Sequence, residues 1–409
     1  MRECLTWPFA RSTLLIMSRR LTIGRAGLAL VATTGALLAG GGSAEAATSP
    51  WTVMPAQTVA DQNFILNAVA APAAADIWTV GYHWENVGGA LEFRALAEHS
   101  SGGGFTIVPT PDRETGAPVN DMLQDVSGVS SSDVWTVGTS RASGTPSQTL
   151  IEHWDGHTWR ITTSANPGVY GNDLEGVTAI APNDVWAVGA RQDAFYQTPM
   201  AEHWNGATWT VATVPNPTGC TGHSYLTDVT AIATNNVWAT GWCGSGGSTP
   251  EQGYIVRWNG TRWLVKAAYG DIPANTELYG VAARHVGDVW AVGTFRAGGG
   301  ALAVHWNGHT WTQQTIGAPQ ETANLRAVAG TRGRLPWAVG AGPSPQPPFA
   351  GPTSIRFAAD QGQPVPVDVS YGSLRGITFA PDGSLWAVGT QLPGKNDIPL
   401  IVSQPAPAG

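Results

Sequence analysis

A short phrase of the sequence, D-V-W-A-V-G in its most regular copies, recurs along the chain at intervals of 47 to 57 residues. Every copy keeps its tryptophan and, three residues later, its glycine, although the other letters vary. The seven tryptophans stand at positions 78, 135, 186, 238, 290, 337 and 386. A period near fifty residues with fixed aromatic and glycine landmarks is typical of β-propeller blades. The sequence therefore predicts a ring of seven blades.

Each repeat unit predicts four β-strands. In the third unit we expect them over residues 174–180, 185–189, 200–204 and 208–212. Asn205-Gly206, between the last two, is a dipeptide typical of tight hairpins. Alternating apolar residues and β-branched side chains support all four strands. Four antiparallel strands with the first innermost make one blade, so the predicted fold is an all-β, seven-bladed propeller.

The two ends of the chain share one blade in this prediction. The last unit has a second strand at 385–389 and a third at 400–403, but no fourth. Residues 51–55 repeat the fourth-strand pattern seen in Trp209-Thr210-Val211. We expect this N-terminal strand to complete the last blade and to close the ring without a free sheet edge. The predicted propeller spans 47–403, and a short flexible tail follows at 404–409.

The repeats resemble those of secreted actinobacterial seven-bladed propellers and, more broadly, kelch and galactose-oxidase-like propellers. The resemblance covers residues 51–403 and implies the fold. The sequence departs from the kelch pattern, because each second strand ends in one glycine (Gly138, Gly189, Gly293) rather than a pair. It also lacks a copper-binding constellation, so the oxidase activity is not carried over. We expect no metal and no cofactor.

The N-terminal segment has the pattern of an export signal. Arg19, Arg20 and Arg25 precede an apolar run over 26–38, and Ala44-Glu45-Ala46 forms a cleavage site. We predict a signal peptide over 1–46, with Met17 as an alternative start. The run is too short to span a membrane. Arg19-Arg20 weakly resembles a twin-arginine signal, so the Sec and twin-arginine routes both stay open. The predicted location is secreted and extracellular.

The charge of the chain limits its partners. Its net charge is −8 and only 12% of its residues are charged. Nucleic acid requires a basic surface, so we exclude it as a partner. No other stretch is apolar enough to span a membrane. We expect a monomer that meets a carbohydrate or protein ligand outside the cell.

Two cysteines remain once the leader is removed. Cys4 lies in the predicted signal peptide, which leaves Cys220 and Cys243. Outside the cell a lone pair favours a disulfide over a metal or redox site. We expect both cysteines in loops on the same face of the ring, which supports the pairing.

Most tryptophans and histidines fall on repeat positions and are interpreted as scaffold. The repeated indoles are expected to pack blade against blade; a repeated inter-blade sugar site is the alternative. One third-strand position carries His99, His153, His203 and His305. We expect these histidines to be struts bonded to acidic turn residues such as Asp133, Asp184 and Asp288 rather than metal ligands. In the mature chain only Trp84 and Trp242 lie off the pattern.

The variable loops indicate the working face. Second-to-third-strand loops and blade connectors lie on one face of a propeller, and here they differ from blade to blade. Function usually sits on loops held by a rigid scaffold. The candidate binding residues that we place on this face are Tyr82, His83, Trp84, Glu85, Arg191, Phe195, Tyr196, His223, Tyr225 and Trp242.

One position of the innermost strands is polar and varied where a scaffold residue should be uniform. It follows the leading leucine of each strand. In blade order it holds Asn67, Gln124, Glu175, Thr227, Tyr279, Arg326 and Arg375. This set is expected at the mouth of the central channel, with a solvated rim as the alternative. If the protein is an enzyme, its catalytic residues are Glu175, Tyr279, Arg326 and Arg375.

The function that these patterns favour is binding rather than catalysis. An aromatic face with a few hydrogen-bonding groups suits a carbohydrate, a cell-wall polymer or a protein. A carbohydrate-active hydrolase or lyase at the channel mouth stays open, and so does a multivalent lectin with sites between the blades.

Overall fold

The computed structural model describes residues 50–59, 62–87, 90–113, 119–244, 251–296, 299–317, 322–343, 350–358, 361–392 and 396–406. The chain divides into two units, 1–46 and 47–409, and all described residues belong to the second. The predicted signal peptide lies outside the described residues, as do the last three residues of the predicted tail.

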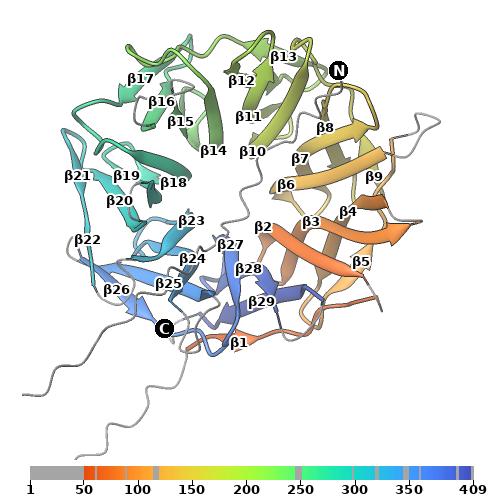
Figure 1. The fold of residues 1–409 in the computed structure, drawn as a ribbon. Helices are drawn as coiled ribbons and strands as arrows, with labels where there is room; N and C mark the ends of the chain where they lie inside the picture. Colours follow the sequence, from red (N-terminus) through yellow and green to blue (C-terminus); the bar gives the residue numbers. More distant parts are fainter. Residues whose placement is uncertain are drawn as a thin grey trace, which may run out of the picture. The chain divides into compact units, whose positions relative to one another are not determined.

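Seven sheets surround a common axis in the second unit, and their first strands are innermost (Figure 1). Blade 1 contains β2 (Asn63–Ala73), β3 (Asp76–Val87), β4 (Ala90–Ser100) and β5 (Thr106–Val108). Blade 2 contains β6 (Val119–Ser130), β7 (Asp133–Ala142), β8 (Gln148–Trp154) and β9 (Trp159–Ile161). Blade 3 contains β10 (Gly171–Ala181), β11 (Asp184–Gln192), β12 (Gln197–Trp204) and β13 (Trp209–Ala212). Blade 4 contains β14 (Ser224–Ala233), β15 (Asn236–Cys243), β16 (Gln252–Trp258) and β17 (Trp263–Ala267).

The remaining blades follow the same order. Blade 5 contains β18 (Thr276–His285), β19 (Asp288–Phe295), β20 (Ala301–Trp306) and β21 (Trp311–Gln313). Blade 6 contains β23 (Asn324–Ala329), β24 (Trp337–Pro343), β25 (Ala350–Ala358) and β26 (Gln361–Val365), and β22 (Thr315–Ile316) joins its outer edge in parallel. Blade 7 contains β27 (Gly372–Phe379), β28 (Leu385–Gln391), β29 (Ile398–Gln404) and β1 (Thr52–Val53). The predicted all-β propeller of seven four-stranded antiparallel blades is confirmed. No helix among the described residues is long and apolar enough to cross a membrane.

The N-terminal strand lies at the outer edge of blade 7. β1 pairs antiparallel with β29, with Thr52 opposite Ser403 and Val53 opposite Val402. The preceding residue, Trp51, is buried and meets Trp337 edge-on at 5.8 Å between ring centroids. Its indole Nε1 donates to Ser354 Oγ at 3.0 Å. The two ends of the described chain therefore share a sheet. That this pairing holds the ring closed stays a prediction.

Aromatic rings join each blade to the next. The indole of Trp78 in blade 1 meets Trp154 and Trp159 of blade 2 at 4.9 and 5.1 Å between centroids. The second-strand tryptophans of the other blades contact a ring of the following blade in the same way. Six of these seven indoles are at most 8% exposed, whereas Trp386 is half-buried. This confirms the packing role expected for the repeated tryptophans.

The repeated histidines are struts, as expected. His153 Nε2 lies 2.8 Å from Asp133 Oδ1, and its ring stacks on Trp135 at 4.1 Å. The same arrangement recurs at His99, His203 and His305, each with the acidic residue and the tryptophan of its own blade. In blades 4 and 6 an arginine replaces the histidine: Arg257 lies over Trp238, and Arg356 lies over Trp337.

Several segments predicted as loops are strands. β3 and β4 continue as a long hairpin in which Trp84 pairs with Phe93, so Tyr82, His83, Trp84 and Glu85 lie on β3. Arg191 lies on β11, and Trp242 and Cys243 lie on β15. The variable composition of these segments predicts loops. In the structure, however, the backbone of each segment pairs with the backbone of the adjacent strand in its hairpin, so the strands extend through them.

We expect Trp51→Ala to lower the free energy of unfolding by about 3–5 kcal/mol, since it removes a buried aromatic side chain from the blade 6–7 junction. Val53→Ala is the matched control, because Val53 lies two residues further along, on β1, and is 52% exposed. Deleting residues 51–55 should also promote aggregation by freeing the edge of β29. Thermal denaturation and size-exclusion chromatography provide the readouts. A deletion variant as soluble and as stable as the parent contradicts closure by β1.

Candidate functional site at the inner ring

Each of the seven innermost strands carries a β-bulge at the same place. Pairing with the second strand skips one residue in every blade, and the skipped residue follows a leucine that is fully buried. A bulge leaves its extra residue unpaired and redirects the side chain. We call these seven residues the inner ring. Its members are Asn67, Gln124, Glu175, Thr227, Tyr279, Arg326 and Arg375, which is the set singled out from the sequence.

Side chains of the inner ring contact neighbouring blades. Arg375 Nη1 donates to Asn67 Oδ1 at 3.4 Å, and Asn67 Nδ2 donates to Gln124 Oε1 at 2.9 Å. The guanidinium carbon of Arg326 lies 4.3 Å from the centre of the Tyr279 ring, a cation–π distance. The structure thus brings the predicted ring residues together around the axis.

The innermost strands approach each other closely just after the bulge. A Cβ on Gly376 would lie 2.7 Å from Ala68 Cα of the next blade, so in blade 7 this position requires glycine. In blades 2 and 4 an aspartate takes this position and bridges to the following blade. Asp125 Oδ2 accepts from Val177 N, and Asp228 Oδ2 accepts from Val281 N, both at 2.7 Å. These contacts fix the spacing of the inner ring.

A carboxyl group and two guanidinium groups lie on opposite sides of the inner ring. Glu175 belongs to blade 3, and Arg326 and Arg375 belong to blades 6 and 7, which lie opposite blade 3 in a ring of seven. The two arginines are exposed and Glu175 is half-buried. Burial, and then the charge of Asp173, raises the pKa of Glu175 to about 8. None of the ion pairs found among the described residues involves these three side chains.

A second polar layer lies two residues before the bulge in blades 3 to 5. It consists of Asp173, Tyr225 and Glu277. Burial and the charges of Asp173, Glu175 and Glu251 raise the pKa of Tyr225 to about 12. Sequence reasoning singled out Tyr225 alone in this layer, although the two-residue spacing from the inner ring could have found the other two.

Two further charged groups extend this layer and carry no repeat signal. Arg296 forms an ion pair with Glu251, and its Nε lies 3.5 Å from Glu277 Oε1. The hydroxyl of Tyr279 donates to Glu277. A chain of polar contacts therefore leads from the loops to the inner ring in blades 4 to 6.

The predicted aromatic residues form two clusters rather than one site. On blade 1, Trp84 lies 6.2 Å from Phe93 and 6.1 Å from Tyr82 between ring centroids. Trp84, which the sequence places on the variable-loop face, lies on β3 and is half-buried against the ring directly opposite on β4.

The second cluster spans blades 3 and 4. The ring of Tyr196 meets His223 edge-on at 5.3 Å, and Tyr225 stacks on Trp242 at 4.7 Å. His223 lies between these two pairs, 6.2 Å from Tyr225. This cluster borders the polar layer through Tyr225, whereas the blade 1 cluster is separated from it by blade 2.

The other predicted binding residues do not converge. His83 stacks on Phe64 at 5.7 Å, and Arg191 pairs with Asp193 at 3.2 Å. Phe195 is 91% exposed. Glu85 lies on β3, and its side chain is outside the described part of the structure.

The two cysteines lie in contact in the core beside the second aromatic cluster. Both appear as free thiols, with Cys243 fully buried and Cys220 half-buried. A hydrogen bond with Cys243 is the main cause that lowers the pKa of the Cys220 thiol. The sequence prediction of a disulfide stays a prediction, now between side chains in direct contact.

We predict that protein recovered from an oxidising compartment contains the Cys220–Cys243 bond, because the two thiols already form a hydrogen bond in the fold. Peptide mapping should find both cysteines protected from alkylation until a reductant is added. Alkylation of both residues in the untreated folded protein contradicts the pairing.

Stability should fall as the pH rises from about 5 to about 8. Burial raises the pKa of Glu98, Asp125 and Glu202 to about 7 and that of Glu175 to about 8. Because the unfolded values are about 4, the folded state binds more protons in this window, and stability is lost as these groups ionise.

We expect the melting temperature to drop by about 5 °C or more between pH 5 and pH 8. Glu175→Gln should lessen the drop by stabilising the protein at pH 8 and not at pH 5. Burial lowers the pKa of His223 and opposes the trend, but through one group only. Stability that rises from pH 5 to pH 8 contradicts the burial of these acids.

No protein-family model and no curated protein matches this chain. Solved structures do match. YCF48 bound to D1 peptide is 13% identical, with a TM-score of 0.53 over 87% of this chain and 94% of its own. Streptogramin B lyase is 15% identical, with a TM-score of 0.53 over 86% of this chain and 96% of its own. YCF48 from Cyanidioschyzon merolae is 15% identical, with a TM-score of 0.53 over 87% of this chain and 98% of its own. At these identities the likeness shows the propeller fold alone.

Proposed function

We propose that this chain is an exported binding protein that takes a peptide segment of another protein at the inner ring. The observation that carries the proposal is the arrangement of polar groups there: Glu175 lies across the ring from Arg326 and Arg375, and none of the ion pairs found among the described residues involves these three side chains. A peptide offers carboxylates, amines and backbone amides within a short length, so it can match both sides. The export signal predicted from the sequence supports an encounter outside the cell.

The surroundings of the ring support a polar, extended ligand. Asp173, Tyr225 and Glu277 continue the polar surface toward the loops, and Trp242 and Tyr196 border it with apolar area. Binding sites commonly combine aromatic surface with a few oriented polar groups. One propeller of similar fold, YCF48, is described with a bound D1 peptide.

A second candidate function is catalysis at the same ring, and one observation favours it. With a pKa of about 8, the carboxyl group of Glu175 is protonated at neutral pH and can donate a proton. Tyr279 and the two arginines lie on the same ring, and streptogramin B lyase has a similar fold. This candidate function requires that the protein convert its ligand into a product. A multivalent lectin is less well supported, because aromatic rings of the chain itself occupy every blade junction.

The proposal is tested by screening residues 47–409 against a random peptide display library and a glycan panel. Selected peptides should bind with one site per chain. Arg326→Gln and Arg375→Gln should each weaken binding by about tenfold, because each removes a charge-assisted hydrogen bond. Glu175→Gln should weaken binding by a smaller factor at neutral pH, because it replaces a protonated carboxyl group, which is itself uncharged. Arg160→Gln is the matched control, since Arg160 lies exposed on the outer strand of blade 2.

Three outcomes contradict the proposal. One is peptide binding that the three ring variants leave unchanged. Another is binding confined to glycans, which returns the function to carbohydrate recognition at the aromatic clusters. The third is turnover of the selected ligand that is lost in Glu175→Gln, which establishes the enzyme instead.

A further inference from the structure

The second-strand tryptophans of six blades have a planar nitrogen group beside the indole ring. In blades 1, 2, 3 and 5 it is a histidine, with ring centroids 4.1 to 4.4 Å from the indole. In blades 4 and 6 it is an arginine, with the guanidinium carbon 5.4 and 6.0 Å from the ring centre. The group always comes from the third-strand residue directly opposite the tryptophan.

The junction between blade 7 and blade 1 departs from this pattern at three positions, two in blade 7 and one in blade 1. Ser403 pairs with Trp386 where His153 pairs with Trp135, so no ring or guanidinium covers the indole there. Ser384 takes the place of the strut aspartate. In the adjoining blade 1, Ser100 follows His99 where Trp154 follows His153. Around the indole of Trp386, serines thus stand where other blades have a histidine, an aspartate and a tryptophan.

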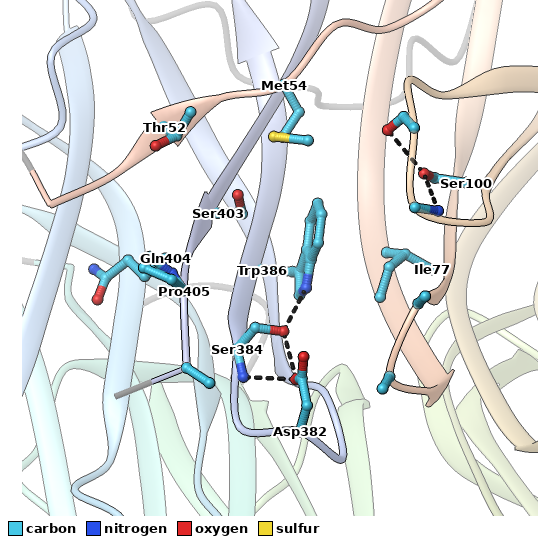
Figure 2. A pocket seen from close by; sticks show the side chains of 15 residues that line it. Thr52, Met54, Ile77, Ser100, Asp382, Ser384, Trp386, Ser403, Gln404 and Pro405 are labelled. Carbon is cyan, nitrogen blue, oxygen red and sulfur yellow. Dashed lines mark hydrogen bonds between the residues drawn. The ribbon is translucent and has the colours of Figure 1, made fainter. Parts of the chain in front are cut away.

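The result is a cavity of about 480 Å³ beside Trp386 (Figure 2). Its walls come from blade 7 and blade 1, at the end of the blades with the short turns, so it is separate from the loops that border the inner ring. Trp386 is the second-strand tryptophan that is half-buried rather than buried. At the blade 4–5 junction, where Arg257 lies over its tryptophan, the cavity measures about 140 Å³.

Blade 7 also keeps a carboxylate near its indole, but this carboxylate belongs to Asp382, two residues before the usual aspartate position. Trp386 Nε1 donates to Ser384 Oγ at 3.1 Å, and Ser384 Oγ donates to Asp382 Oδ1 at 2.7 Å. In blade 2 the corresponding indole donates directly to Asp133 at 2.9 Å. The carboxylate of blade 7 thus stands at the exposed edge of the cavity rather than inside the blade.

We propose that this cavity is a binding site for a guanidinium group, as in an arginine side chain, which stacks on Trp386 and pairs with Asp382. The chain fills six equivalent positions with planar nitrogen groups, two of them guanidinium, and at this one it keeps the indole and a carboxylate but has a serine on the third strand. The guanidinium of Arg334 lies against Gly383, next to Asp382, but it does not line the cavity. A planar cation gains from the indole face and from the carboxylate together. The site does not depend on the function proposed for the inner ring.

The proposal is tested with arginine amide as the probe, by isothermal titration calorimetry on residues 47–409. We expect saturable binding with one site per chain. Ser403→His combined with Ser384→Asp restores the histidine and aspartate of the other blades, so it should abolish binding and raise the melting temperature. Asp382→Asn should weaken binding about three- to fivefold, as expected for an exposed ion pair.

Asp271→Asn is the control, because Asp271 is an exposed acid in the connector between blades 4 and 5. If the double variant fails to fold, Asp382→Asn decides the matter alone. The proposal is overturned if arginine amide shows no saturable binding, or if Asp382→Asn and the control bind it equally. It is also overturned if neutral methyl glycosides compete for the site as well as arginine amide does.

Discussion

The packing of one indole between two blades is the interaction on which the rest of the structure depends. Each second-strand tryptophan lies against an aromatic ring of the following blade, and in six blades a histidine or arginine of its own blade covers it as well. An aromatic side chain removes about 150–250 Å² from water. Seven such junctions set the angle between neighbouring sheets, and a constant angle brings the seventh sheet beside the first. The inner ring inherits its spacing from these junctions.

The blade count, the strut histidines and the inner ring could all be predicted from the sequence, because the sequence repeats. The blade count follows from the spacing of Trp78 to Trp386, and the strut role of His153 follows from its recurrence at one third-strand position. A residue type that returns at the same position in most blades meets the same surroundings each time. The inner ring was found by the same comparison, as a position whose content varies among blades that are otherwise alike.

The other features of the two sites could not be predicted, because they depend on contacts between segments that do not repeat. Trp84 was placed in a loop because its neighbours differ from those of other blades, yet Phe93 lies directly opposite and extends the hairpin around it. Glu251 and Arg296 come from different blades and meet beside Glu277 only in the fold. Ser403 carries no signal by itself. Its importance appears once the histidine of the other blades is known to lie on the indole.

Positions that depart from the repeat therefore mark the two candidate binding sites. These are the polar inner ring and the uncovered indole of Trp386 in blade 7. The indole N–H resonances of the second-strand tryptophans report on all seven junctions in one experiment. When arginine amide is added to ¹⁵N-labelled residues 47–409, the Nε1–H resonance of Trp386 should shift progressively to saturation, while those of the six covered tryptophans stay unchanged. Equal shifts at all seven indoles, or a shift at a covered indole without one at Trp386, would contradict the account.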